Sequence, residues 1–252
     1  MIKYLKILFF LFVLSLSNNV NAKPVPPGAG GGDVAANILF LVDSSASMGR
    51  WIGGDGIGPI AGVTYDSQNR ILMTQYSRRT AGAVIRYALN NAGNATVRDT
   101  SFRPIRQVPR NGCTQFNDGG SHNGQRLRKA HHIEFVQDLN SVSFNESVIL
   151  LHSGERRTGS YIFGYSEDGR RCLIALRAPN NMSVRAFDVK TIGGTPFLFS
   201  AGGARRTQGF FMSCNLETFV CNEQIINDSR NVVRWVNRFS VNNEGTLAYF
   251  AN

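Results

Sequence analysis

Apolar and polar positions alternate along most of this chain in a pattern that predicts β-structure. Residues 38–42 are five consecutive apolar side chains between Asn37 and Asp43, as expected for a strand buried on both faces. After residue 60, β-rich segments alternate with turns that contain Asn, Asp and Gly. Gly-rich and Asn-rich turns interrupt every longer window, so the 3.6-residue spacing of an amphipathic helix is not sustained. We therefore expect a mainly β protein with little helix.

Strand-turn-strand units recur along the second part of the chain, with centres near Asn69, Asn145 and Asn243. The three units occupy residues 62–76, 140–152 and 239–250. Further strands are predicted at residues 83–87, 159–165, 183–189 and 196–200. The intervals between centres are close to two propeller-blade lengths of about 40 to 50 residues each. This spacing predicts β-propeller-like repeats over residues 61–252, and an antiparallel sandwich with similar turns is the alternative.

The N-terminus has the three parts of a secretory signal. Lys3 and Lys6 precede an apolar run over residues 7–15, and a small residue, Ala22, marks the cleavage site. The run is shorter than the roughly 20 apolar residues that a membrane-spanning helix needs. We expect residues 1–22 to be removed and the protein to be secreted or held at the cell surface, which is periplasmic or extracellular in a bacterium. An uncleaved anchor is the alternative, and we expect no stable membrane insertion after cleavage.

Two further segments frame the predicted repeats. Residues 23–36 are rich in Pro and Gly and predict a flexible leader. Residues 247–250 have the pattern of a strand that begins just before the last residue of the sequence. A propeller needs a closed ring to protect its edge strands, so we expect the repeats to be incomplete here, and a small ring closed by this last strand is the alternative.

The charge distribution bears on nucleic-acid binding, and the cysteine content bears on disulfide formation. The net charge is +10, but the basic residues are scattered in pairs without a nucleic-acid-binding motif around them. We therefore expect no nucleic-acid partner. The four cysteines suit disulfides in an oxidising compartment, with Cys214 and Cys221 bridging a hairpin and Cys113 paired with Cys172. Four cysteines allow three pairings, and a zinc site is a rival interpretation that lacks a Cys-x-x-Cys pair.

The strongest chemical signal is the segment Asp43-Ser44-Ser45-Ala46-Ser47, directly after the predicted strand at residues 38–42. The Asp43 carboxylate and the Ser45 and Ser47 hydroxyls are hard oxygen ligands of the kind that Mg²⁺ prefers, with Ca²⁺ and Mn²⁺ as alternatives. A loop at the carboxyl end of a buried parallel strand lies where ligands bind. The rival interpretation is a helix N-cap or a hydrogen-bonded turn, since Asp and Ser favour both.

Residues 37–49 as a whole resemble the beginning of a von Willebrand factor A domain with its metal-ion-dependent adhesion site. Together with the export signal and the later β repeats, the chain is similar to pilus-tip adhesins of the PilY type. The resemblance implies a partial or interrupted α/β A-domain segment over residues 37–60. It further implies adhesion to a protein or surface ligand through an acidic group that completes the coordination of Mg²⁺, possible pilus subunits among the partners, and no enzymatic activity.

The chain departs from the family pattern in two places. The glycines and Pro59 within residues 50–59 forbid the helix that should follow the first metal loop. The second-loop threonine is best matched by Thr195, whose Gly-Gly-Thr-Pro setting is similar to that of bacterial members but lies far downstream. An insertion of propeller-like blades would explain this distance, and a plain turn between strands is the rival interpretation. No residue matches the third-loop aspartate.

Two other functions remain open on the sequence alone. An exported β-propeller enzyme, a hydrolase or a lyase, would need a set of catalytic residues that the sequence does not assemble. His152 lacks a Gly-x-Ser-x-Gly elbow beside it, and Glu167 and Asp168 fall in a predicted hairpin turn. A propeller scaffold without metal chemistry is the other alternative. Adhesion is the function that we predict.

Overall fold

The computed structural model describes part of the chain. The described residues are 60–75, 84–89, 96–118, 120, 122–128, 130, 132–155, 159–203, 208–227 and 238–251. The chain separates into two units, residues 1–41 and 42–252, and all described residues belong to the second. The predicted signal, the leader and the A-domain-like segment up to residue 59 lie outside the described residues.

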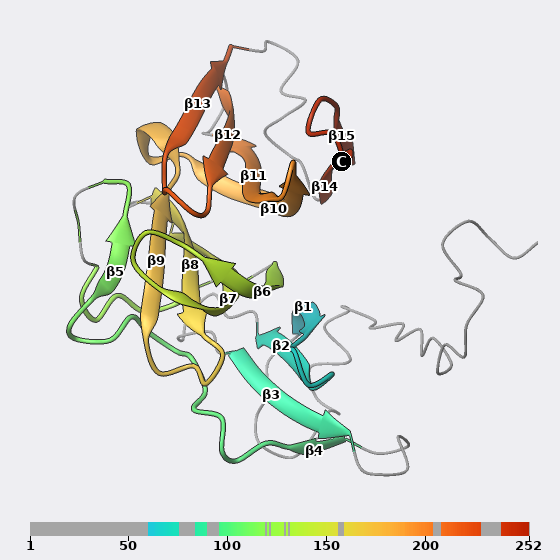
Figure 1. The fold of residues 1–252 in the computed structure, drawn as a ribbon. Helices are drawn as coiled ribbons and strands as arrows, with labels where there is room; N and C mark the ends of the chain where they lie inside the picture. The colour runs from blue at the N-terminus through green and yellow to red at the C-terminus, as the bar shows by residue number, and fades with distance from the viewer. Residues whose placement is uncertain are drawn as a thin grey trace, which may run out of the picture. The chain divides into compact units, whose positions relative to one another are not determined.

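The described chain is mainly β, as predicted (Figure 1). Sheet 1 contains β1 (Ile60–Tyr65), β2 (Ile71–Gln75), β3 (Val84–Leu89) and β4 (Thr96–Arg98). Sheet 2 contains β5 (Cys113–Phe116), β6 (Ile133–Asn140), β7 (Asn145–Glu155), β8 (Gly159–Ser166) and β9 (Cys172–Arg177). Sheet 3 contains β10 (Ser183–Ile192), β11 (Thr195–Gly203), β12 (Gly209–Asn215) and β13 (Cys221–Ile226), and a hairpin of β14 (Arg238–Val241) and β15 (Ala248–Ala251) follows.

Each sheet is built from strands that pair with their neighbours in sequence. β1–β4, β6–β9 and β10–β13 are antiparallel meanders, and β5 alone pairs in parallel, with β9. The first strand of each sheet lies against the sheet that follows or precedes it: β1 contacts β6, β10 contacts β7 and β8 and to a lesser extent β6, and β14 contacts β10. The described chain therefore contains three successive meanders and a hairpin, each in contact with its neighbour.

One turn type recurs between strands of these units. In the turns after β1, β8 and β14, a carbonyl accepts the N–H of the residue three positions later, at 2.8–3.0 Å. That later residue is Asn69, Gly169 or Gly245, and each has a positive φ of 57°, 74° or 72°. Gly adopts this left-handed conformation freely and Asn tolerates it, which explains the residue types found there. The predicted turns at Asn69 and near Asn243 are confirmed.

The second turn, predicted near Asn145, lies directly before that residue. Asn145 begins β7 and pairs with Asn140, and the turn is formed by residues 141–144. The Ser141 hydroxyl accepts the N–H groups of Ser143 at 3.3 Å and of Phe144 at 3.0 Å, so a serine closes this turn.

As far as the structure describes it, the first interval between predicted centres does not hold the two blades that its length predicts. β1 begins at Ile60 and β6 at Ile133, but the described residues between sheet 1 and β6 contain β5 alone and no second meander. The later meander and hairpin begin at Ser183 and Arg238. The predicted strands at residues 183–189 and 196–200 are confirmed as parts of β10 and β11.

Hydrophobic cores fill the spaces between successive units. One core joins sheet 2 to sheet 3 and includes Phe187 and Phe210, both fully buried. A second joins sheet 1 to sheet 2 and includes Phe163 and Leu72, also fully buried. Burying one such side chain contributes about 1.5–3 kcal/mol, so these cores hold neighbouring units together. Among the described residues, no helix is long and apolar enough to cross a membrane.

Two disulfides connect neighbouring strands, and both pairings were predicted. Cys113 is joined to Cys172 across the parallel pair β5–β9, and Cys214 to Cys221 across the hairpin β12–β13. No cysteine remains free to hold zinc. Disulfides of this kind are typical of proteins that fold outside the reducing cytoplasm.

A buried hydroxyl without a partner gives a first prediction. Tyr165 is 1 % exposed, and its hydroxyl makes no hydrogen bond in the core between sheets 1 and 2. Burial raises the pKa of this phenol far above its ordinary value, so the group stays neutral. We expect Tyr165→Phe to raise the free energy of unfolding by about 1 kcal/mol, because an unsatisfied polar group leaves the core.

Urea unfolding checks this result, with Ser200→Ala as a parallel case. The Ser200 hydroxyl is likewise buried without a partner, but it lies in sheet 3. A loss of stability in Tyr165→Phe would show that the hydroxyl binds a buried water and would contradict the expectation.

Candidate functional site

Of the four predicted metal ligands, the described residues include only Thr195. Thr195 is half-buried and begins β11 directly after the two-residue turn Gly193-Gly194, opposite Ile192. Both glycines have positive φ, 58° and 88°, which is the geometry that best joins two twisted antiparallel strands. The hairpin therefore explains the Gly-Gly-Thr-Pro segment by itself. Asp43, Ser45 and Ser47 lie outside the described residues, so the shared metal site stays a prediction.

An ion-pair network joins sheet 1 to the turn between β8 and β9. Its members are Asp66, Arg70, Arg86, Asp99 and Glu167. Arg70 Nε lies 2.6 Å from Asp66 Oδ2, and Arg86 Nε lies 2.8 Å from Asp99 Oδ2. Arg70 Nη2 reaches the Glu167 carboxylate at 3.2 Å. The Asp66 carboxylate is fully buried and also lies 3.5 Å from Arg86 Nη1.

The network also shapes the backbone around it. Asp66 Oδ1 accepts the N–H groups of Gln68 and Arg70, which closes the turn after β1. Hydrogen bonds from Ser101, together with the Arg86 guanidinium, lower the pKa of Asp99 to about 2. Because the carboxylates of the network already face guanidinium groups, this cluster fixes sheet 1 against sheet 2.

A polar cleft of about 280 Å³ lies where β5, β9 and β13 approach one another. It is lined by Asn117, Asp118, Arg177, Ala178, Pro179, Asn180, Asn181 and Glu223. Pro179–Asn181 form a short 3₁₀ turn, in which Asn180 and Asn181 have positive φ. Amide and carboxylate groups predominate, so the cleft suits hydrogen-bonding or basic ligands.

Arg177 organises one wall of this cleft. Its Nη1 lies 3.3 Å from Asp118 Oδ2, and its guanidinium lies over the Tyr161 ring, 5.7 Å from the centroid. The Asn117 side chain accepts the Arg177 N–H at 2.7 Å and donates to the Arg177 carbonyl at 3.2 Å. These contacts hold the end of β5 against the end of β9.

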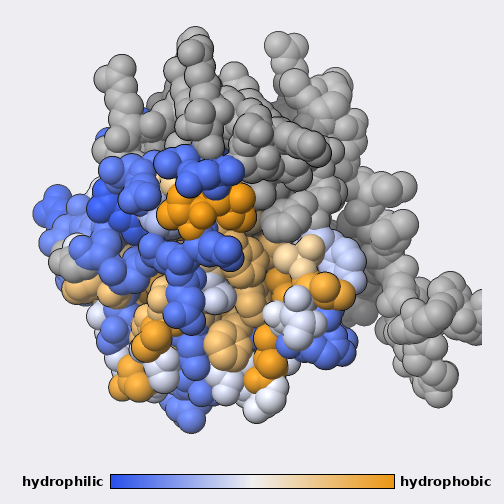
Figure 2. All heavy atoms as spheres, turned by 90° about the horizontal axis from the view of Figure 1, so that it is seen from above, coloured by the Kyte–Doolittle hydropathy of each residue, from blue (hydrophilic) through white to orange (hydrophobic). Residues whose placement is uncertain are grey.

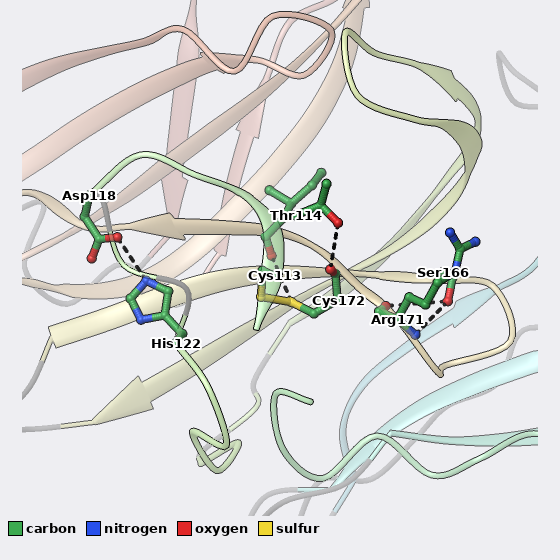
Figure 3. The surroundings of a disulfide bond; sticks show 8 residues. Cys113, Thr114, Asp118, His122, Ser166, Arg171 and Cys172 are labelled. Atoms are coloured by element: carbon green, nitrogen blue, oxygen red, sulfur yellow. Dashed lines mark hydrogen bonds and ion pairs between the residues drawn. A yellow bond between two sulfur atoms is a disulfide. The ribbon is translucent and has the colours of Figure 1, made fainter. Parts of the chain in front are cut away.

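His122 and a disulfide lie behind Asp118, next to this wall. His122 Nε2 lies 2.9 Å from Asp118 Oδ1, on the segment that follows β5, and Figure 3 shows this pair beside the Cys113–Cys172 bond. The His122 ring packs against Tyr161 at a centroid distance of 4.4 Å. Burial raises the pKa of the Tyr161 phenol. The Asp118 carboxylate is therefore shared between His122 and Arg177.

The first strands of successive units are joined by carboxylates. Glu134 on β6 accepts the N–H of Val189 on β10 at 3.0 Å, and Asp188 on β10 accepts the N–H of Val241 on β14 at 2.8 Å. Burial raises the pKa of Glu134, whose other oxygen lies 2.9 Å from His132 Nε2. A hydrogen bond from a backbone N–H to a carboxylate thus connects β6 with β10 and β10 with β14.

The surface between these features is mixed in polarity. Figure 2 shows hydrophilic and hydrophobic side chains interspersed over the described part of one face. Exposed apolar residues include Val142, Val220 and Ile225, which are 72 %, 62 % and 36 % exposed. In the part of the chain that the structure describes, His, Cys, Asp and Glu side chains form no group of three that could hold a metal ion.

Sequence reasoning missed the cleft and the ion-pair network. Asn117 and Arg177 are far apart in sequence, and the parallel pairing of β5 with β9 brings them together. No local motif marks such a pair. The predicted hairpin turn at Glu167 and Asp168 is confirmed, and His152 is buried 3.2 Å from the Ser160 hydroxyl.

The chain was compared with protein-family models, curated proteins and solved structures. No protein-family model, no curated protein and no solved structure matches this chain. The fold is that of a mainly β protein built from antiparallel meanders, with two disulfides that join neighbouring strands.

Proposed function

We propose that this chain is an exported adhesin, at the cell surface or on a pilus, that grips its partner through a Mg²⁺ ion. The observation that carries the proposal is the segment Asp43-Ser44-Ser45-Ala46-Ser47 directly after the apolar run at residues 38–42. The predicted signal at residues 1–22 and the two disulfides support a site of action outside the cytoplasm.

The meander units are, in this proposal, blades of a β-propeller. The succession of antiparallel meanders supports it, because propeller blades are meanders of about four strands arranged one after another around a central channel. The backbone bonds of Glu134 and Asp188 support the same arrangement. The blades would supply a rigid support for the metal loop.

In the proposed site the Asp43 carboxylate, the Ser45 and Ser47 hydroxyls and the Thr195 hydroxyl hold the ion. Mg²⁺ prefers oxygen ligands and keeps some of its waters. A carboxylate from the partner, a protein or another surface ligand, replaces one of these waters. Ca²⁺ and Mn²⁺ are the alternative ions.

Titration calorimetry on the Asp43→Ala variant tests the site. We expect Mg²⁺ affinity to fall by roughly 100-fold, about 2.8 kcal/mol, because the anionic ligand is lost. Glu223→Ala is the matched control, since it removes an exposed carboxylate from β13 and leaves the metal loop intact.

Two results would contradict the proposal. One is equal Mg²⁺ affinity in wild type and Asp43→Ala. The other is a melting temperature and surface adhesion that do not change when EDTA removes divalent ions. A metal-free scaffold would then be the better description.

A further inference from the structure

We propose that β13, the edge strand of sheet 3, binds an extended protein segment as an added strand and selects one with a basic side chain opposite Glu223. The proposal does not depend on the metal site. Strand addition of this kind takes affinity from main-chain hydrogen bonds and specificity from side chains next to the edge.

Within the described part of the chain, β13 is an edge strand. β13 is last in the order β10-β11-β12-β13, and among the described strands it pairs with β12 alone. Its four central residues, Asn222, Glu223, Gln224 and Ile225, are all exposed. A six-residue strand whose outward N–H and C=O groups pair with no other described strand is a template for pairing.

The groups that face outward follow from the register. The Asn215 N–H donates to the Val220 carbonyl at 3.0 Å, so the next pair, Cys214 with Cys221, is a non-hydrogen-bonded pair. The Cα–Cα distance of 4.0 Å across this disulfide agrees with that assignment. Because the pattern alternates, the N–H and C=O groups of Cys221, Glu223 and Ile225 point away from β12.

The edge is also held in place before any partner arrives. The Cys214–Cys221 disulfide ties the beginning of β13 to β12, so little chain ordering is needed on binding. Sheet 2 already uses the same mode, because its last meander strand, β9, is covered by β5 and joined to it by a disulfide. The corresponding edge of sheet 3 has no such cover among the described residues.

The carboxylate of Glu223 favours a bound segment that carries a basic side chain. Glu223 is the one charged residue of β13, and its side chain lines the polar cleft together with Asp118, Asn180 and Asn181. Asp118 is paired with Arg177, whereas the described residues contain no ion pair for Glu223. A Lys or Arg directly opposite would therefore find a carboxylate at the cleft. A second copy of β13 would bring two Glu223 carboxylates close together, which disfavours self-pairing.

The test uses a fluorescent peptide, acetyl-Thr-Val-Thr-Lys-Thr-Val-Thr-amide, and a version with Glu in place of Lys. In fluorescence anisotropy we expect the wild type to bind the Lys peptide about tenfold more tightly than the Glu peptide. Glu223→Lys should invert this preference, and Glu223→Ala should abolish the preference while keeping weak binding of both peptides.

Glu223→Pro tests the main-chain bonds. Proline removes an outward N–H, which an edge strand tolerates, and the bonds to β12 remain. We expect this variant to lose both peptides while it keeps the near-ultraviolet circular dichroism of the wild type. If Glu223→Pro does not fold, Ile225→Pro makes the same test at the next outward position.

Three outcomes would overturn the proposal. They are no binding of the Lys peptide up to roughly 1 mM, equal binding of both peptides to the wild type, and a wild-type dimer in sedimentation that Glu223→Pro converts to monomer. Peptide binding should be unchanged in EDTA and in Asp43→Ala, so failure of the metal site would leave this result standing.

Discussion

Replacing Cys113 and Cys172 together by alanine is expected to lower the free energy of unfolding by about 4 kcal/mol. The two residues are separated by 59 positions, so the disulfide removes much chain entropy from the unfolded state. It also fixes β5, a four-residue strand that pairs with β9 alone among the described strands. Guanidinium unfolding of the double variant, followed by circular dichroism, measures the loss.

The second disulfide is the matched control. Cys214 and Cys221 are only seven positions apart, and the same chain-entropy relation gives about 2.5 kcal/mol for their removal. The longer bridge should therefore be the more costly one to lose. Equal losses, or a larger loss for the short bridge, would show that loop length does not govern stability here.

Arg86→Met is expected to cost about 3 kcal/mol, because it removes the more buried of the two cations, Arg70 and Arg86, that face the Asp66 and Asp99 carboxylates. The Arg86 side chain is 6 % exposed and lies 3.5 Å from the buried Asp66 carboxylate and 2.8 Å from that of Asp99. It also donates to the Glu167 carbonyl at 3.1 Å, across the junction of sheets 1 and 2. Methionine keeps much of the apolar volume, so the measured loss reports mainly on charge and hydrogen bonding.

Arg170→Met provides the control for the second prediction. Arg170 pairs with Asp168 at 3.9 Å, but both side chains are more than half exposed, and such a pair contributes less than about 1 kcal/mol. Urea unfolding of both variants at pH 7 makes the comparison. Equal small losses would show that the buried network carries no more energy than a surface pair.

The network also gives a pH dependence with a definite sign. The pKa of Asp99 falls from 3.8 to about 2 in the folded protein. A carboxyl whose pKa is lower in the folded state stabilises the fold above its unfolded pKa, and this contribution is lost as the pH falls from about 4 to 2. In Arg86→Met the Asp99 pKa should rise, so less stability remains to be lost over that interval.

The features that could be predicted from the sequence are local ones. The turn at Asn69 was recognised because a positive φ favours Asn or Gly, and the Cys214–Cys221 bridge because seven positions suit a hairpin. The strands at residues 183–189 and 196–200 were recognised from their apolar and β-branched residues. Each of these signals lies within one short segment of the chain.

Features that depend on distant segments could not be predicted. β9 carries a continuous apolar run, which periodicity alone does not assign to a particular sheet. Glu167 binds Arg70 from nearly 100 positions away, and only the packing of sheet 1 on sheet 2 creates that contact. The polar cleft has the same origin.

The parallel pairing of β5 with β9 imposes an order on biosynthesis. Cys113 is made well before Cys172, and β5 can pair only after β9 has been synthesised. Until then the early thiol is exposed to oxidants and to the two later cysteines, whose own hairpin closes within microseconds. The maturation rate of this protein should therefore follow the supply of disulfide-exchange catalysts more closely than the intrinsic speed of strand pairing.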